Sequence, residues 1–371
     1  MDIFSAMQAH DFEQLVFCQD RASGLKGLIA IHSTALGPAL GGTRMWNYSS
    51  EPEAVTDALR LARGMSYKAA IAGLPLGGGK GVIIGDPEKG KSEALFKAYG
   101  QRIQALGGSY ITAEDVCTCP EDMDTIRTCT PWVVGTSAGG GDPSPYTAWG
   151  VVQGIRAALG YRLGQTSLTG RTVAVQGLGH VGGWLCSYLA DLGAELVVTD
   201  INPDRAAGIA AQVGGVQVQP EAIYSQECDV FAPCALGAVL NDQTIPQLRC
   251  SIVAGAANNV LHEPRHGLSL HERGILYIPD YVINAGGLIC VADQLEAFDP
   301  QRVQKRVDRI YETCLEVLAL AEKQDIPPFE AADRVAEDRM RSGRGRKASR
   351  SRAKADDSML ISGNWAAELS I

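Results

Sequence analysis

The stretch from residue 172 to residue 200 constrains the fold of this chain more than any other. It begins with TVAVQ, passes through GLGHVG and an apolar helical pattern, and ends with AELVVTD. Such a pattern predicts a buried strand, a turn, a helix and a second strand. The turn fits the G-x-G-x-x-G motif, and Asp200 stands at the end of the second strand. The hexapeptide alone would be a weak signal, but this context predicts a dinucleotide-binding βαβ unit.

The glycines of the turn match what a dinucleotide requires. Gly177 would make the tight turn, Gly179 would let a pyrophosphate approach the backbone, and Gly182 would let the helix pack on the strand. The pyrophosphate would lie at the helix N-terminus beside His180 and Val181, because free amide groups there attract anions.

Asp200 bears on the choice between the two nicotinamide cofactors. Its carboxylate would accept hydrogen bonds from the adenosine ribose hydroxyls and repel a 2′-phosphate, which favours NAD over NADP. An aspartate that only caps a helix is the structural alternative. Arg205, close by in the sequence, leaves some room for NADP.

The chain as a whole alternates strands and helices in two blocks, which predicts an α/β fold with two domains. A Gly/Pro/Ser stretch at 137–150 interrupts the periodicity and indicates a hinge or domain boundary. Before it, helices are predicted from residue 51 and over 91–106, and strands over 68–73, 80–85 and 110–115. After it, strands over 172–176, 194–200, 228–235, 251–259 and 274–279 precede a long helical pattern over 300–324.

Composition argues against several classes of protein. The net charge of −9 disfavours nucleic-acid binding by the whole chain, and no apolar run reaches the roughly 18 residues of a membrane span. The N-terminal residues carry an early acid and no basic region, so no signal peptide is expected. The ten cysteines then indicate reduced thiols and a cytoplasmic location. Cys117, Cys119 and Cys129 cluster, but their spacing matches no common structural zinc site, so no metal is expected.

The C-terminal segment is basic, unlike the chain as a whole, which is acidic. Between Arg339 and Lys354 the chain carries eight basic residues and no acid. A solvated, largely disordered extension is the main interpretation, and contact with nucleic acid or another acidic partner is the alternative.

Three charged residues stand at the edges of apolar runs in the first block, namely Lys68 in GMSYKAA, Lys80 in GGGKG and Asp115 in ITAEDV. The stretch around Lys80 fails the phosphate-binding P-loop pattern, because Leu74 replaces its first glycine and Gly81 its hydroxyl residue. Glycines around a lysine can instead let a small substrate approach closely. One lysine could hold a carboxylate, a desolvated lysine could act as base, and the aspartate could receive an ammonium proton. Each residue alone could equally be a surface or strand-end charge.

Long stretches of the sequence resemble the Glu/Leu/Phe/Val amino-acid dehydrogenase family, most closely its members that act on leucine. They include LGPALGGTR (36–44), LARGMSYKAAIAGLPLGGGKGVIIGDP (61–87), YITAEDV (110–116), DPSPYTAWGV (142–151), AVQGLGHVG (174–182), YSQECDVFAPCALGAVLND (224–242), VAGAANNVL (253–261) and PDYVINAGGLICVADQL (279–295). The resemblance implies NAD-dependent, reversible oxidative deamination of a branched-chain L-amino acid (leucine, valine or isoleucine) to the 2-oxo acid and ammonia. It also implies a homo-oligomer. The alternatives are the same reaction on aromatic amino acids, as in phenylalanine or tryptophan dehydrogenases, and a non-catalytic ligand-binding protein of the same fold.

The resemblance also assigns roles to residues. It implies that Lys80 is the general base that activates water and that Asp115 relays a proton. Lys68 would bind the substrate carboxylate together with the Gly41–Gly42 backbone and Asn259. The nicotinamide would lie in a cleft between the domains, near Thr147, Cys234, Ala235 and Asn258.

The side-chain pocket of the family maps onto five apolar residues: Leu40, Met65, Ala113, Leu288 and Val291. A glutamate substrate is disfavoured, because a buried carboxylate needs a cationic partner. Leu288 departs from the valine typical of the leucine-specific members, and a leucine there occurs in relatives that act on aromatic amino acids. Cys290 stands where an asparagine is usual, and Cys117 and Cys119 replace residues that follow Asp115.

The implied organisation has four parts. A substrate-binding and oligomerisation domain is expected over residues 1–145 and a Rossmann-type NAD-binding domain over 146–328, with a cleft between them. A helix at 329–340 would pack back toward the first domain, and a basic tail would occupy 341–371.

Overall fold

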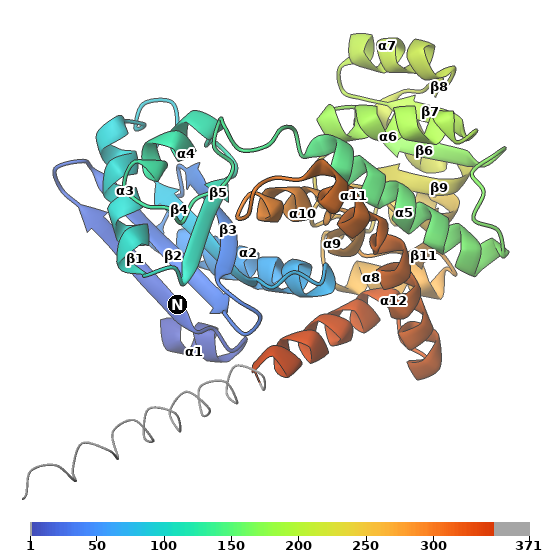
Figure 1. Cartoon of the computed structure of the whole chain (residues 1–371). Helices are drawn as coiled ribbons and strands as arrows, with labels where there is room; N and C mark the ends of the chain where they lie inside the picture. The colour runs from blue at the N-terminus through green and yellow to red at the C-terminus, as the bar shows by residue number, and fades with distance from the viewer. Residues whose placement is uncertain (1, 345–371) are drawn as a thin grey trace, which may run out of the picture.

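Two sheets, each with its own helices, organise the computed structural model, which describes residues 2–344 (Figure 1). The first domain contains a five-stranded sheet in the order β1-β2-β4-β3-β5. Its strands are β1 (Gln14–Asp20), β2 (Leu25–Ser33), β3 (Ala39–Trp46), β4 (Gly77–Ile84) and β5 (Tyr110–Glu114). Its helices are α1 (Ile3–Gln8), α2 (Glu51–Ile71), α3 (Glu93–Ala105) and α4 (Pro120–Arg127).

Pairing in this sheet changes direction at β4. β2 runs antiparallel to both β1 and β4, whereas β3 runs parallel to both β4 and β5. The register places Thr43 of β3 opposite Gly81 on one side and opposite Glu114 on the other. Residues next to these three positions on the three strands therefore lie in one row across the sheet.

The second domain contains a six-stranded sheet in the order β11-β10-β9-β6-β7-β8, and all of its pairs are parallel. Its strands are β6 (Thr172–Gln176), β7 (Glu195–Thr199), β8 (Val216–Gln217), β9 (Glu227–Pro233), β10 (Arg249–Val253) and β11 (Leu276–Tyr277). The chain moves to one side of β6 and then to the other, so a crevice is expected at the carboxyl end of β6, where such folds bind dinucleotides.

The helices of the second half of the chain are α5 (Ser144–Leu163), α6 (His180–Asp191), α7 (Pro203–Val213), α8 (Arg265–Glu272), α9 (Asp280–Ile283), α10 (Gly286–Asp293), α11 (Pro300–Asp308) and α12 (Ile310–Gln324), with 3₁₀ turns η1 (Pro220–Ser225) and η2 (Ile245–Gln247). Polar caps fix where several helices begin: the hydroxyl of Ser50 accepts from the Glu53 amide before α2, and the hydroxyl of Ser92 from Leu95 before α3. No helix of the described chain is long and apolar enough to cross a membrane.

The α/β fold is confirmed, but two element predictions were wrong. The apolar run at 68–73 was predicted as a strand, and it forms the last turn of α2 and the turn after it. Its alanines favour a helix, and their burial on several sides hides the helical period. The pattern over 300–324 was predicted as one helix, and it is divided at Arg309 into α11 and α12.

A helix over residues 328–344 crosses back to the first domain. Arg339 donates from its guanidinium to the carbonyls of Ala70 and Ile71 at the end of α2, and Glu337 accepts from the hydroxyl of Tyr67. The basic tail was expected to begin at residue 341. Residues 341–344 instead continue this helix, and Arg344 at its end pairs with Asp11. The remainder of the predicted tail lies outside the described residues.

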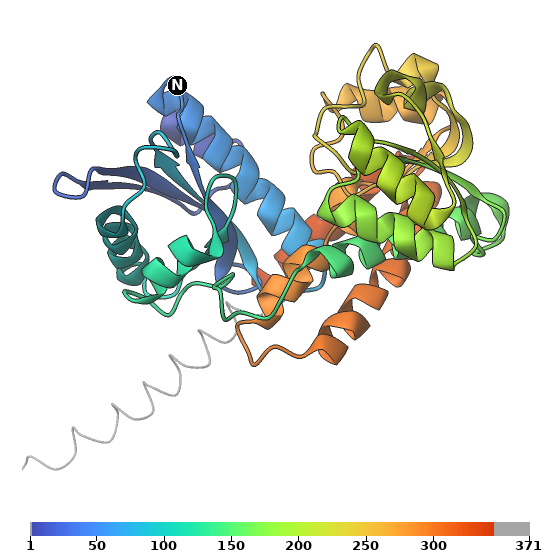
Figure 2. The ribbon, with the colours of Figure 1, turned by 90° about the horizontal axis from the view of Figure 1, so that it is seen from above.

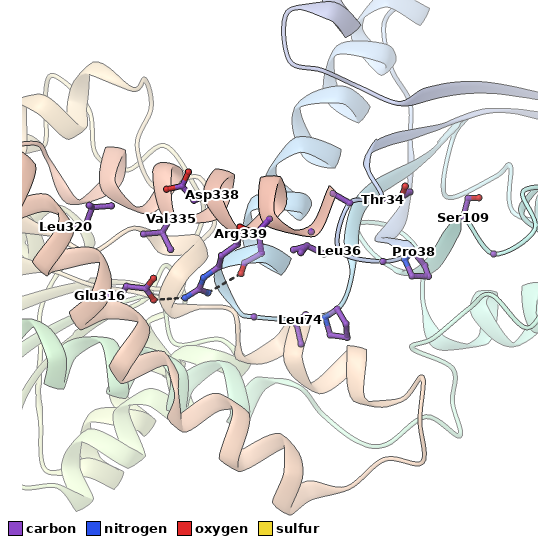
Figure 3. Close-up of a pocket in the computed structure, with 18 of the residues that line it drawn as sticks. Thr34, Leu36, Pro38, Leu74, Ser109, Glu316, Leu320, Val335, Asp338 and Arg339 are labelled. Carbon is purple, nitrogen blue, oxygen red and sulfur yellow. Dashed lines mark hydrogen bonds and ion pairs between the residues drawn. The ribbon is translucent and has the colours of Figure 1, made fainter. Parts of the chain in front are cut away.

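A cavity of about 1210 Å³ lies between this helix and the first domain (Figure 3). Leu36, Leu74, Leu320 and Val335 line it, and the ion pair of Arg339 with Glu316 lies in its wall. None of the residues predicted to form the catalytic site lines this cavity. The candidate site is therefore placed by its charged side chains and not by this cavity.

Candidate active site

Lys80 and Asp115 form a close ion pair inside the first domain. Lys80 lies on β4, and Asp115 follows β5, on the far side of β3. The lysine Nζ is 2.7 Å from Oδ2 of the aspartate, and only 6% of the lysine side chain is exposed. Asp115 is more accessible, with 26% of its side chain exposed. The structure thus brings together the two residues that were predicted to exchange protons.

The surroundings of this pair shift both pKa values downward. Burial lowers the pKa of Lys80, although the charge of Asp115 opposes that shift. Burial alone would raise the pKa of Asp115, but the charges of Lys80 and Arg44 outweigh it and hold that pKa below its usual value. A lysine whose pKa is lowered gives up its proton more readily than an exposed lysine, and the adjacent carboxylate can receive or return a proton.

The glycines next to Lys80 serve packing, so the expectation that they clear a path for substrate was wrong. A Cβ on Gly78 would lie 2.0 Å from the backbone nitrogen of Ser66 on α2. One on Gly81 would lie 2.1 Å from the hydroxyl of Tyr99. The glycine run is therefore needed because α2 and a buried tyrosine lie directly against β4.

Lys68 lies in the last turn of α2, which reaches from the first domain toward the second (Figure 2). Its Nζ is 3.4 Å from Oδ1 of Asn258, which belongs to the second domain. Burial lowers the pKa of Lys68 to about 8, and the charge of Asp280 opposes this shift. Lys68 is therefore a cation between the domains, where it could bind a substrate carboxylate.

Asn259, the other predicted carboxylate ligand, points elsewhere in this structure. Its Oδ1 accepts a hydrogen bond from Arg60 of α2 at 3.2 Å, and its backbone has a φ of 52°. The neighbouring Asn258 is the asparagine that contacts Lys68. Gly41 and Gly42 lie on β3, and a Cβ on Gly42 would be 2.8 Å from Cβ of Asp115, so this pair is beside Asp115.

The five predicted pocket residues belong to one apolar cluster. Leu40 and Ala113 come from the first domain, Leu288 comes from the second, and Met65 and Val291 pack against the same cluster. A substrate side chain bound among them would meet only apolar surface, which disfavours a charged side chain. The cluster extends through both domains, so it places all five residues in apolar surroundings, and their meeting in one pocket stays a prediction.

The glycine-rich turn fits a dinucleotide. Gly177 has a φ of 91°, and a Cβ on it would lie 2.6 Å from Ala235. A Cβ on Gly182 would lie 2.0 Å from the carbonyl oxygen of Gly177, so only glycine fits. Gly179, which precedes α6, has no protein atom within 4 Å of its Cβ position. The backbone there is open on the side where a pyrophosphate would approach the helix N-terminus.

Asp200 closes the turn from the next strand. Its Oδ2 accepts from the Leu178 amide at 2.7 Å, and its Oδ1 accepts from the Asn202 amide at 2.8 Å. Arg205 lies 3.5 Å from Oδ2. Burial would raise the pKa of Asp200, but these amides and Arg205 lower it overall, so the carboxylate is ionised at neutral pH.

Most of the remaining predicted cofactor residues lie beside this glycine-rich turn. The Cys234 amide donates to the carbonyl of Gln176 at 2.7 Å, which places Cys234 and Ala235 beside Gly177 and Gly182. Thr147 on α5 lies against Gly287. His180 and Val181 begin α6. Apart from Thr147 and Asn258, these residues are gathered at the carboxyl end of β6.

Models of one protein family match both domains of this chain. One, described as Glu/Leu/Phe/Val dehydrogenase, dimerisation domain, matches residues 12–131. A second, described as Glutamate/Leucine/Phenylalanine/Valine dehydrogenase, matches residues 202–344. The chain belongs to this family. This dehydrogenase is an enzyme that acts on amino acids, and the predicted resemblance is confirmed.

Leucine dehydrogenase of Geobacillus stearothermophilus is 55% identical over 347 residues, which are 93% of this chain and 95% of that protein. Valine dehydrogenase of Streptomyces coelicolor is 52% identical over 340 residues, 90% of this chain and 93% of that protein. The crystal structure of L-tryptophan dehydrogenase from Nostoc punctiforme has a TM-score of 0.85 at 45% identity, covering 92% of this chain and 99% of that one.

The three cysteines that depart from the family pattern, Cys117, Cys119 and Cys290, lie in a loop, before a helix and inside a helix. Cys119 is the residue before α4, where its backbone amide donates to Asp122. Cys117 has a φ of 58° in the loop after Asp115, and Cys290 is buried in α10. Within residues 2–344, no group of three or more histidine, cysteine or acidic side chains is arranged to hold a metal ion.

Two polar residues of the site were missed by sequence reasoning. Arg44 donates to Asp115 at 2.9 Å, and Asn284 donates to Oδ1 of Asn258 at 2.9 Å and to the carbonyl of Ala256 at 3.0 Å. The signal for Arg44 was a charge inside LGGTRMW, an otherwise apolar strand that lies beside Lys80. Nothing in the local sequence pattern singles out Asn284.

Proposed function

We propose that this protein catalyses the NAD-dependent, reversible oxidative deamination of leucine, valine and isoleucine to their 2-oxo acids and ammonia. The observation that carries the proposal is the buried Lys80–Asp115 pair, with Lys68 on the same domain facing a dinucleotide-binding domain. The names and identities of the leucine and valine dehydrogenases support the branched-chain substrates. An intact proton-transfer pair disfavours a non-catalytic binding protein.

Each residue has a chemical part in this reaction. Lys68 holds the substrate carboxylate, helped by the Gly41–Gly42 backbone and Asn259. Asp115 accepts a proton from the substrate ammonium, so that the neutral amine can form an imine. NAD, held by the second domain, would supply the acceptor for the hydride of Cα. Lys80 removes a proton from the water that attacks the imine carbon, and ammonia then leaves to give the 2-oxo acid. Closure of the two domains excludes bulk water from these steps.

The turn of Gly177, Gly179 and Gly182 would hold the pyrophosphate of NAD, with His180 and Val181 at the helix N-terminus. Asp200 would bind the adenosine ribose. The nicotinamide end would lie near Thr147, Cys234, Ala235 and Asn258. The open side of Gly179 and the ionised carboxylate of Asp200 support this placement.

Asp200→Ala is expected to weaken NAD binding and to narrow the preference for NAD over NADP, because the ribose acceptor and the repelling charge are both removed. Arg205 would also lose its partner and could pair with a 2′-phosphate. The measurement is kcat/KM for both cofactors, with Asp204→Ala, an exposed acid in the first turn of α7, as the control. A wild-type enzyme that uses NADP as well as NAD would overturn this role of Asp200.

The same reaction on aromatic amino acids is the second candidate. Leu288 favours it, because this position departs from the valine expected for leucine specificity, and the tryptophan dehydrogenase structure is similar. Leu288 is buried in the same apolar cluster as Leu40 and Ala113, so a change there would alter the volume of a pocket formed with them.

We expect graded use of leucine, valine and isoleucine, because one methylene in an apolar pocket is worth about 1–3 kcal/mol. Phenylalanine should be a poorer substrate of the wild type, because Leu40 and Val291 limit the depth of the pocket. Leu288→Val restores the valine expected for leucine specificity, so it should lower the kcat/KM for phenylalanine relative to leucine further. Leu270→Val, which shortens a buried leucine of α8 in a separate apolar cluster, is the control. A wild type that favours phenylalanine over leucine by more than about tenfold, or 1.4 kcal/mol, would contradict the branched-chain assignment.

Three broader predictions accompany the proposal. A homo-oligomer is supported by the family model for residues 12–131, whose description names a dimerisation domain. A cytoplasmic location is supported by ten cysteines, which suit a reducing compartment. We also place the domain boundaries at residues 145 and 328, on either side of the six-stranded sheet.

A further inference from the structure

We propose that Arg44 is a positioning residue of this reaction, which turns one oxygen of Asp115 toward the substrate and keeps Lys80 available as a base. The inference rests on the proposed function, because it assumes that Lys80 and Asp115 are the proton-transfer pair. It adds a residue that acts through both of them without touching the reacting atoms.

The hydrogen bonds of Asp115 are unevenly shared between its two oxygens. Nε of Arg44 donates to Oδ2 at 2.9 Å, and Nζ of Lys80 donates to the same Oδ2 at 2.7 Å. No side chain or backbone group of the described chain donates to Oδ1. Two cations from different strands on one oxygen fix the plane of the carboxylate, so Oδ1 is left to accept a proton from the substrate ammonium.

Arg44 is itself held firmly. Its second nitrogen donates to Oδ2 of Asp57 on α2 at 3.0 Å. Asp57 also accepts from the hydroxyl of Tyr48 at 2.6 Å and from Arg60 at 3.1 Å. The planar guanidinium thus bridges two carboxylates, one on α2 and one after β5, which a lysine ammonium cannot do with the same geometry. This bridge makes the orientation of Asp115 independent of bound substrate.

Arg44 also has an electrostatic effect on Lys80. In an isolated ion pair with Asp115, the lysine would hold its proton tightly and would be a poor base at neutral pH. Burial is the main cause that lowers the pKa of Lys80, and the positive charge of Arg44 adds to it, while Asp115 and Asp57 oppose it. Removing the charge of Arg44 should therefore raise the pKa of Lys80.

The other groups that face Lys80 carry no charge at neutral pH. β2 places Ala30 opposite Lys80 in the register. The phenols of Tyr99 on α3 and Tyr110 on β5 lie behind Gly81, and burial raises the pKa of both, to about 12 for Tyr110. Besides burial, the charges that act on the pKa of Lys80 are thus those of Asp115, Asp57 and Arg44.

The test is the pH dependence of kcat/KM for leucine in Arg44→Gln, which removes the charge and keeps a donor. The acid limb of the profile, which reports the pKa of Lys80, should move upward by on the order of one pH unit. On the acid side of the limb, activity at a given pH should therefore fall about tenfold, and it should recover at higher pH. Arg44→Lys retains the charge, so its limb should stay in place, while its rate plateau should fall because the bridge to Asp57 is lost.

Tyr48→Phe is the matched control, because it removes one hydrogen bond to Asp57 and leaves both cations on Asp115. Thermal unfolding and NAD binding show whether each variant is folded. A folded Arg44→Gln with an unshifted acid limb overturns the inference, and so does an Arg44→Lys whose limb and plateau both match the wild type. Wild-type turnover in Lys80→Ala would instead overturn the proposed function, so the two failures can be told apart.

Discussion

Lys80→Ala is expected to lower kcat by about 10²–10⁴-fold, the usual contribution of a general base. The lysine is buried against Asp115, and the described residues place no other lysine in contact with that carboxylate. NAD affinity should stay close to wild type, because Lys80 lies in the first domain and the glycine-rich turn lies in the second. Steady-state kinetics and calorimetric titration with NAD measure the two effects separately.

A second lysine provides the control for this experiment. Lys91 also belongs to the first domain and forms an ion pair with Asp122 at 2.6 Å, outside the site. Lys91→Ala should therefore leave kcat nearly unchanged. If Lys80→Ala retains turnover within a few-fold of wild type, Lys80 is not the base.

Asp115→Asn is expected to lower kcat by about 10²–10³-fold, because the acceptor for the substrate ammonium proton is lost. The variant also removes the carboxylate that raises the pKa of Lys80, whereas Arg44 remains. The pKa of Lys80 should then fall further, so the acid limb of the pH profile should move to lower pH. This movement is opposite in sign to the one expected for Arg44→Gln.

The adjacent acid is the control for Asp115. Glu114 is exposed at the end of β5 and forms no ion pair within the described residues. Glu114→Gln should keep both the rate and the pH profile of the wild type. An Asp115→Asn enzyme with normal turnover would remove the carboxylate from the mechanism.

The parts of the molecule that sequence predicted well depend on short-range rules. Gly177 needs a positive φ, and a Cβ on Gly182 would clash with the carbonyl of Gly177, so these two glycines of the motif follow from the turn itself and are visible in the sequence. The strands β6 and β7 are short buried runs bounded by turns and match their predicted ranges closely. The pairing of Lys80 with Asp115, in contrast, was expected from a family resemblance and not from spacing.

The parts that sequence missed depend on contacts between distant segments. Lys68 was placed on a strand, because a helix buried on several sides loses the period that identifies it. The glycines beside Lys80 were attributed to substrate access, because the close approach of α2 and Tyr99 cannot be read from the glycine run. Arg44 acquires its role only through the register of β3 between β4 and β5.

The chain passes between the two domains at two places, once in the segment before α5 and once in the segment that leads into the helix over 328–344. That helix is fastened to the end of α2 through Arg339. A rigid body attached at two points can rotate about the line that joins them. It cannot translate, and it cannot rotate about other axes. Opening and closure would thereby be reduced to one rotation, so Lys68 and Asn258, which are 3.4 Å apart here, would separate and meet again along the same arc in every cycle.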